Sequence, residues 1–86
     1  MTVSEDSHEF NRTLGKRVRG LRKRYGWTQQ QLAERMKMKQ HTVSRYEIGE
    51  YGLSVWQLAM LSSVFAITIE SWFIDDATWQ NFVRQL

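Results

Sequence analysis

Residues 28–49, TQQQLAERMKMKQHTVSRYEIG, decide the fold, because they contain two short amphipathic helices separated by a turn. Thr28 and Gln31 have the capping-box spacing, in which the threonine hydroxyl accepts from a backbone N–H three residues on and the glutamine side chain reaches back. We therefore expect the first helix to begin after Thr28. Its inward-facing side chains are Leu32, Ala33 and Met36. Ala33 has no side chain beyond Cβ, which lets the two helices approach closely.

The second helix is expected over residues 40–47. Val43 and Tyr46 face inward in this register, and Gly49 supplies a left-handed stop. The outward side chains are polar donors and acceptors, namely Gln40, His41, Thr42, Ser44 and Arg45. A helix of this kind fits the major groove of B-form DNA, which is about 12 Å wide. The pair therefore predicts a helix-turn-helix that reads duplex DNA.

One longer helix is expected before this pair and ends at Gly26. Its apolar side chains recur at spacings of three or four residues, at Phe10, Leu14, Val18, Leu21 and Tyr25. The opposite face is basic and solvated by default, although some of its side chains would reach phosphates: Arg12, Lys16, Arg17, Arg19, Lys23 and Arg24. Residues 1–9 have few apolar side chains and are expected to form a disordered leader.

Three further helices are expected after the pair. Ser54 and Gln57 form a second capping box. The helix that follows runs to about residue 65 and has four inward side chains, Val55, Leu58, Leu61 and Phe65. Thr68 would cap a short helix that carries Ile69, Trp72 and Phe73. Asp75 or Asp76 would cap a terminal helix whose apolar stripe is Trp79, Phe82, Val83 and Leu86.

Length and composition agree with one small all-α domain. A chain of 86 residues that folds around one core buries only about 60% of the surface that it exposes when unfolded, which leaves little room for a catalytic cleft. The chain has no cysteine for disulfides or a thiolate zinc site. It has no apolar run of ~20 residues for a membrane span and no signal-peptide pattern, so a cytoplasmic protein is expected. We predict a five-helix DNA-binding domain over residues 10–74 and a short amphipathic helix over residues 75–86.

The positive charge is concentrated in one block. Residues 12–45 hold eleven of the twelve Lys and Arg residues and a single acid, which gives +10, whereas residues 1–11 carry −3 and residues 46–86 carry −4. Such a block is expected where a polyanion docks, because each neutralised phosphate releases condensed counterions. Taken alone, the block is explained equally well by a solvated basic face without a partner.

The run WTQQQLAERMKMKQHTVSRYEIGE, preceded by LGKRVRGLRKRYG and followed by LSVWQLAMLSSVFAITIESWF, resembles the Xre family of helix-turn-helix regulators, whose relatives include phage lambda repressor and Cro. The resemblance spans about residues 14–73 and rests on the joint spacing of Gln29, Leu32, Ala33, Val43, Ser44, Glu47 and Gly49. It implies a lambda-repressor-like domain of five helices and a role in sequence-specific DNA binding.

The resemblance also implies roles at matching positions. Gln29 matches the family glutamine that binds a phosphate and braces the first recognition residue, and Gln40 matches the glutamine that bonds an adenine edge. Arg45 could contact either a guanine edge or a phosphate, and the sequence does not distinguish the two. The residues expected to contact bases are Gln40, His41, Ser44 and Arg45, and those expected to contact phosphates are Gln29, Lys39, Thr42 and Lys16. Arg22 and Glu47 match a structural ion pair that is largely buried in some relatives.

Three positions depart from the family pattern. Lys37 stands in the turn where many members have a glycine, so either a left-handed backbone there is mildly strained or the turn differs slightly from that of the family. Lys39 replaces a capping Ser or Thr at a helix N-terminus, where a cation is unfavourable unless a phosphate compensates, and we interpret it as a phosphate contact. Ile48 replaces a frequent Asn or Arg and removes one backbone contact to DNA.

The aromatic residues have alternative interpretations. The four tryptophans could form a base-stacking platform, but aromatic residues of this kind more often lie in a core or an interface: Trp27, Trp56, Trp72 and Trp79. The terminal stripe either folds back on its own domain or pairs with a second subunit. We favour pairing, because the five-helix domain already has a core and an exposed stripe would be a liability. The expected dimer-interface residues are therefore Trp79, Phe82, Val83 and Leu86.

The predicted function is that of a homodimeric repressor or repressor-activator on a pseudo-palindromic site, with double-stranded DNA as its partner and no cofactor or metal. A protein partner, such as a toxin or another regulator, is compatible with this, and a phage regulator, an antitoxin and a restriction-system controller are not separable by sequence. The alternative is a protein-interaction module of the same fold that does not read DNA. An enzyme is the weakest option, since the sequence has no phosphate-cradling glycine loop, no nucleophile with a base and no metal cluster.

Overall fold

A computed structural model describes the backbone of residues 3–86 and the side chains from His8 onward. All regular structure within residues 3–86 is helical. The helices are α1 (Val3–Arg24), α2 (Gln29–Met36), α3 (Gln40–Glu47), α4 (Val55–Phe65), the 3-10 helix η1 (Ile69–Phe73) and α5 (Asp76–Arg84). The prediction of an all-α helix-turn-helix fold is confirmed. None of the helices in this part of the chain has both the length and the apolar character that a bilayer crossing requires.

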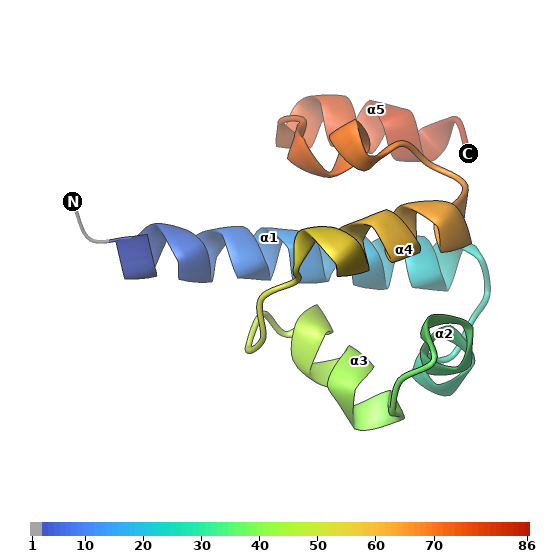
Figure 1. The fold of residues 1–86 in the computed structure, drawn as a ribbon. Helices are drawn as coiled ribbons and strands as arrows, with labels where there is room; N and C mark the ends of the chain where they lie inside the picture. The colour runs from blue at the N-terminus through green and yellow to red at the C-terminus, as the bar shows by residue number, and fades with distance from the viewer. Residues whose placement is uncertain (1–2) are drawn as a thin grey trace.

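Helix α1 is the central element of the fold (Figure 1). In this view α2 and α3 lie on one side of α1, whereas α5 lies on the opposite side. The core side chains come from every helix: Leu14, Val18, Leu21, Leu32, Ala33, Met36, Val43, Leu58, Leu61, Phe65, Trp72 and Trp79. One face of the molecule therefore presents the helix-turn-helix, and the other is closed by the C-terminal helix.

Both predicted capping boxes are present. The Thr28 hydroxyl accepts from the Gln31 N–H at 3.1 Å, and the Gln31 side-chain oxygen accepts from the Thr28 N–H at 2.8 Å. Ser54 and Gln57 make the same reciprocal pair at the start of α4, at 3.1 and 2.9 Å. These bonds satisfy backbone donors that have no partner inside the helix, so they fix where α2 and α4 begin.

The last two helices begin differently. Asp75 caps α5, because its carboxylate accepts from the Thr78 N–H at 2.7 Å, and this hydrogen bond lowers the pKa of Asp75. Thr68 precedes η1, but its hydroxyl lies 2.9 Å from the Ser71 hydroxyl and makes no capping bond to the backbone. Thr68 therefore occupies the predicted N-cap position of η1, but its side chain does not cap the helix.

Helix α1 begins earlier than predicted. It starts at Val3, so the prediction of a disordered leader over residues 1–9 is wrong for residues 3–9, and residues 1–2 lie outside the described residues. A low apolar content was a poor criterion here, because extending a helix that is already anchored adds one backbone hydrogen bond for each residue fixed. Phe10 strengthens this part of α1 by stacking on Phe73, with ring centroids 5.8 Å apart.

Two apolar residues of the helices after the pair are exposed, and one of them, Val55, was predicted to face inward. Val55 is 75% exposed, because it is the first residue of α4 and projects beyond the core. Phe73 is also exposed and covers Phe10 instead of entering the core. At both positions the apolar spacing continues past the end of the buried segment.

Helix α5 packs on its own domain. Trp79 is only 6% exposed, its ring stacks on Trp72 at 5.7 Å, and the Arg17 guanidinium lies 4.8 Å from its centroid. The prediction that Trp79 is a dimer-interface residue is wrong, because a side chain buried within one chain has no surface to offer a second. The rest of the stripe is less covered, with Phe82 and Val83 half-buried and Leu86 exposed.

Arg17 holds α1 against this C-terminal unit. It was expected on a solvated face but is only 5% exposed. One terminal nitrogen donates to the Trp72 carbonyl oxygen and the other to an Asp76 carboxylate oxygen, both at 3.0 Å. These partners lie 55 and 59 residues further along the chain, so local spacing could not reveal them.

The tryptophans do not share one platform. Trp72 and Trp79 are buried, and Trp27 is half-buried against Phe65 at 5.6 Å. Trp56 is 73% exposed at the start of α4. A base-stacking surface built from all four rings is therefore excluded.

Candidate DNA-binding surface

The turn between α2 and α3 is set by a left-handed residue. Lys37 has φ 56° and ψ 47°, the conformation that a glycine adopts most readily. It allows the Met38 N–H to donate to the Ala33 carbonyl oxygen at 2.9 Å and the Lys37 N–H to the Glu34 carbonyl oxygen at 3.2 Å. The chain thus keeps the glycine-type turn with a lysine. The strain expected from the sequence is present at this residue.

Gly15 sets the distance between α1 and α3. A Cβ atom at this position would lie 2.6 Å from the Glu47 carbonyl oxygen and closer still to that of Tyr46. The backbone of α1 therefore rests directly on the last turn of α3. Sequence analysis missed this residue, because a glycine inside a helical pattern gives no sign of which element approaches it.

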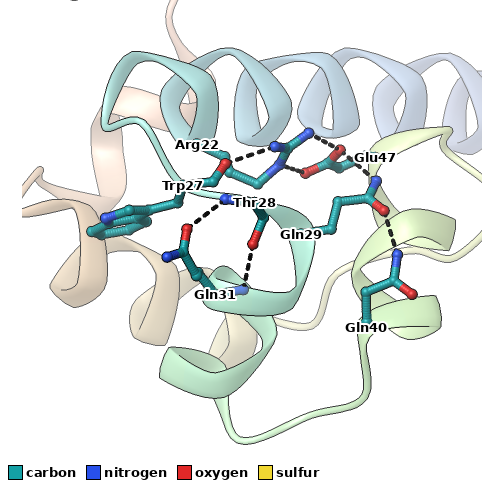
Figure 2. A network of polar contacts seen from close by, with 7 residues as sticks. All are labelled: Arg22, Trp27, Thr28, Gln29, Gln31, Gln40 and Glu47. Atoms are coloured by element: carbon teal, nitrogen blue, oxygen red, sulfur yellow. Dashed lines mark hydrogen bonds and ion pairs between the residues drawn. The ribbon is translucent and has the colours of Figure 1, made fainter.

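A chain of hydrogen bonds joins α1, α2 and α3, the last of which is the predicted recognition helix (Figure 2). Arg22 binds Glu47 through two bonds, from Nε at 2.6 Å and from Nη2 at 3.0 Å, and its Nη1 donates to the Trp27 carbonyl oxygen at 2.8 Å. Both charged side chains are buried. Gln29 then donates to Glu47 at 3.0 Å, and Gln40 donates to the Gln29 side-chain oxygen at 2.6 Å. The ion pair expected from the family resemblance is formed. Through Gln29, it holds the side-chain amide of Gln40 in place.

The anchored Gln40 still has hydrogen-bonding capacity. One of its two amide N–H groups is used by Gln29, which leaves the other N–H and the side-chain oxygen free. A donor and an acceptor on one amide are what a bidentate contact to the adenine N7 and N6 requires. The network therefore orients Gln40 without consuming the groups that would read a base.

The other predicted contact residues of this region lie on or beside α3. His41 and Arg45 are exposed, Thr42 and Ser44 are half-buried, and Lys39 is exposed at the first position before the helix. The Lys39 ammonium group has no acceptor with which to cap α3, and it makes no hydrogen bond or ion pair with the described residues.

Arg45 has neighbours that sequence analysis did not anticipate. Its Nη1 forms an ion pair with Glu50, and its guanidinium carbon lies 5.8 Å from the centre of the Tyr51 ring. The Glu50 carboxylate raises the pKa of Arg45, which remains a cation. Residues 50–53 lie outside every helix expected from the sequence. The one sign of this ion pair in the sequence was that Arg45 and Glu50, which lie on either side of Gly49, have opposite charges.

Residues 13–68 match a family described as the helix-turn-helix domain. The chain belongs to the helix-turn-helix family of DNA-binding regulators. The match covers α2, the turn and α3, together with α4 and the part of α1 that packs on α3. Among the described helices, η1, α5 and the start of α1 lie outside the match.

Two relatives of this helix-turn-helix protein are similar over most of its length. The chain is 39% identical over 61 residues to the competence pilus inhibition repressor of Acinetobacter baylyi, which is 71% of this chain and 56% of that protein. It is 34% identical over 65 residues to an uncharacterized HTH-type transcriptional regulator of Archaeoglobus fulgidus, which is 73% of this chain and 93% of that protein. The chain thus spans about half the length of the first relative and nearly all of the second.

One predicted phosphate contact of the helix-turn-helix protein lies apart from the others. Lys16 lines a hollow between α1 and α5, together with Gly20, Asp76, Trp79 and others. Since α5 and α3 lie on opposite sides of α1 (Figure 1), the fold does not bring Lys16 to the surface that carries Gln40 and Arg45. Gln29 joins that surface through its bond to Gln40.

Proposed function

We propose that this chain is a sequence-specific repressor that binds duplex DNA as a homodimer and inserts α3 into the major groove. The observation that carries the proposal is the side chain of Gln40, which is exposed, held by Gln29 and left with one donor and one acceptor. The basic block over residues 12–45 supports it, because a net charge of +10 attracts the phosphate backbone. Phosphate contacts then supply affinity and α3 supplies the choice of sequence.

The size of α3 supports a twofold arrangement. A helix of eight residues reads only a few base pairs, and a dimer doubles the site when its two recognition helices enter successive major grooves about 34 Å apart. The operator is then pseudo-palindromic. We assign the interface to the part of the terminal stripe that α5 leaves accessible, Phe82, Val83 and Leu86.

The name of the Acinetobacter baylyi relative supports repression as the outcome of binding. A protein that occupies an operator with no catalytic step represses by excluding other proteins from the same DNA. Such a protein acts in the cytoplasm, where the DNA lies, and its output is set by its concentration or by a protein partner.

Selection from a pool of random duplexes tests this function. The protein should enrich one pseudo-palindromic sequence, and its affinity should fall about tenfold or more when the salt concentration rises fourfold, since counterions are released on binding. The double variant Gln40→Ala, Arg45→Ala should lose the choice among sequences. The matched control is Gln80→Ala, Arg84→Ala, which removes the same residue types from exposed positions on α5. Absence of any enriched sequence, or equal effects of the two double variants, would refute the proposal.

A protein-interaction module on the same fold is the second candidate, and one observation favours it. Val55 and Trp56 are 75% and 73% exposed side by side at the start of α4, which is unusual for large apolar side chains. Binding to duplexes that is weak, equal for all sequences and insensitive to salt would favour this candidate over the repressor.

A further inference from the structure

We propose that Glu50 is a positioning residue for DNA reading: it holds one end of the Arg45 guanidinium so that Arg45 reads a base edge, with guanine as its target, and not a phosphate. This inference rests on the proposed function and adds to it which of two ligands Arg45 takes.

The backbone fixes Glu50 beside Arg45. The Arg45 carbonyl oxygen accepts from the Glu50 N–H at 2.9 Å and from the Tyr51 N–H at 3.4 Å. Gly49, with φ 79°, makes this turn, and a Cβ there would lie 2.7 and 2.8 Å from atoms of Arg12. Only glycine fits both the conformation and the space, so the position of Glu50 relative to α3 does not depend on its own side chain.

The side chains form a second bracing chain, at the opposite end of α3 from Gln40. Glu50 binds Nη1 of Arg45, and the Tyr51 ring lies 5.8 Å from the guanidinium carbon. Tyr51 packs edge-on against Tyr46 at 6.0 Å, and the Tyr46 hydroxyl accepts a hydrogen bond from Gln57 of α4. Arg45 is therefore connected to the folded core through the aromatic pair, although about 45% of its side chain remains exposed.

The occupied nitrogen decides which edge of the guanidinium is free. With Nη1 bound to Glu50, the edge formed by Nε and Nη2 remains available. Arg22 uses that same edge to bind the Glu47 carboxylate in this protein, at 2.6 and 3.0 Å. Two parallel N–H donors match the O6 and N7 acceptors of guanine, which is the commonest specific contact of arginine in the major groove.

The local charge favours a base over a phosphate. The Arg45–Glu50 pair has no net charge, and a phosphate bound by Arg45 would lie close to the Glu50 carboxylate, which repels it. A guanine edge is neutral and presents only acceptors. Glu50 thus penalises the phosphate contact and leaves the base contact intact.

The test measures discrimination at single base pairs. After selection with the wild-type protein, Arg45→Ala should lower the preference for one base pair in each half-site by roughly 5- to 150-fold, which is the range for losing a bidentate pair. Glu50→Ala should lower the preference at that same base pair by about 2- to 12-fold, since the freed arginine must be immobilised on binding. Glu50→Gln, which keeps an acceptor oxygen, should retain part of the preference that Glu50→Ala loses at this base pair. Glu70→Ala, which removes an exposed acid on η1, should change nothing at that position.

The outcomes separate this inference from the proposed function. Adding Glu50→Ala to Arg45→Ala should cause no further loss at the shared base pair. Circular dichroism should show the same unfolding temperature for Glu50→Ala and Glu70→Ala, which excludes a general loss of structure. If Glu50→Ala changes affinity equally for all duplexes, or Arg45→Ala alters no base preference while the wild type still selects a palindrome, the inference is overturned and the proposed function stands. A wild-type protein that selects no sequence overturns both.

Discussion

Replacing Gly15 by alanine should lower the free energy of unfolding and weaken DNA binding together. The added Cβ would lie 2.6 Å from the Glu47 carbonyl oxygen and 2.9 Å from its carbonyl carbon. An ordinary carbon–oxygen contact is about 3.3 Å or longer, so α1 and α3 must separate by at least about 0.7 Å. The atoms in the way are backbone atoms of the recognition helix, so no side chain can move aside to accept the methyl group.

The steric term exceeds the gain in helix propensity. Overpacking of this kind costs roughly 1–3 kcal/mol, and a contact against backbone belongs at the upper end of that range. Alanine in place of glycine inside a helix stabilises the folded state by about 1 kcal/mol. We therefore expect a net loss of about 1–2 kcal/mol, or a fall of roughly 4–16 °C in the unfolding temperature of a domain of this size. Because Glu47 anchors Gln29 and Gln40, DNA discrimination should fall as well.

Gly20→Ala is the matched control on the same helix. A Cβ at Gly20 has no neighbour within 4 Å, so this variant should gain about 0.5–1 kcal/mol in stability. Urea and thermal unfolding followed by circular dichroism measure both variants, and titration of a labelled duplex at fixed salt measures binding. If Gly15→Ala is as stable as Gly20→Ala, the claim that α1 and α3 touch through their backbones is refuted.

Three further predictions concern the two left-handed residues, the N-cap of α5 and the buried ring of Trp79. Lys37→Gly and Ala66→Gly should each raise the free energy of unfolding by about 1 kcal/mol, because both residues hold positive φ values of 56° and 57°, and a lower unfolding temperature would contradict this. The Thr78 N–H lowers the pKa of Asp75, so the stabilisation by its carboxylate is present above the unfolded-state pKa and is lost as the pH falls through the lowered folded-state pKa. Unfolding measured from about pH 6 to about pH 2 should show a weaker acid dependence in Asp75→Asn than in the wild type. Trp79→Ala should cost about 3–5 kcal/mol at every protein concentration, because the ring is buried within one chain; a loss that grows with dilution would indicate an interface instead.

The elements of the helix-turn-helix were predictable because their determinants are local. The Thr28–Gln31 and Ser54–Gln57 capping boxes set the start of α2 and α4 through bonds between residues three apart. The bounds expected for the recognition helix, residues 40–47, are those found for α3. The left-handed backbone at Lys37 was one of two possibilities raised by the family resemblance, because many members have a glycine at this position.

Errors arose where a residue depends on partners far along the chain. Arg17 matched a solvated basic face, but Trp72 and Asp76 bury it. Val55 continued an apolar spacing beyond the core, so its periodicity gave the wrong environment. The stripe that begins at Trp79 had two possible partners, its own domain or a second subunit, and only packing could choose between them.

The amino-acid sequence by itself determined where α2, α3 and α4 lie, which residues start α2 and α4, and which polar side chains α3 turns outward, because these depend on hydrogen bonds and apolar spacing within a few residues. The tertiary structure alone decided that Gly15 lets α1 rest on α3, that Trp79 closes the domain, and that Glu50 braces Arg45. These contacts join separate elements, and their geometry is set only when the core brings the helices together.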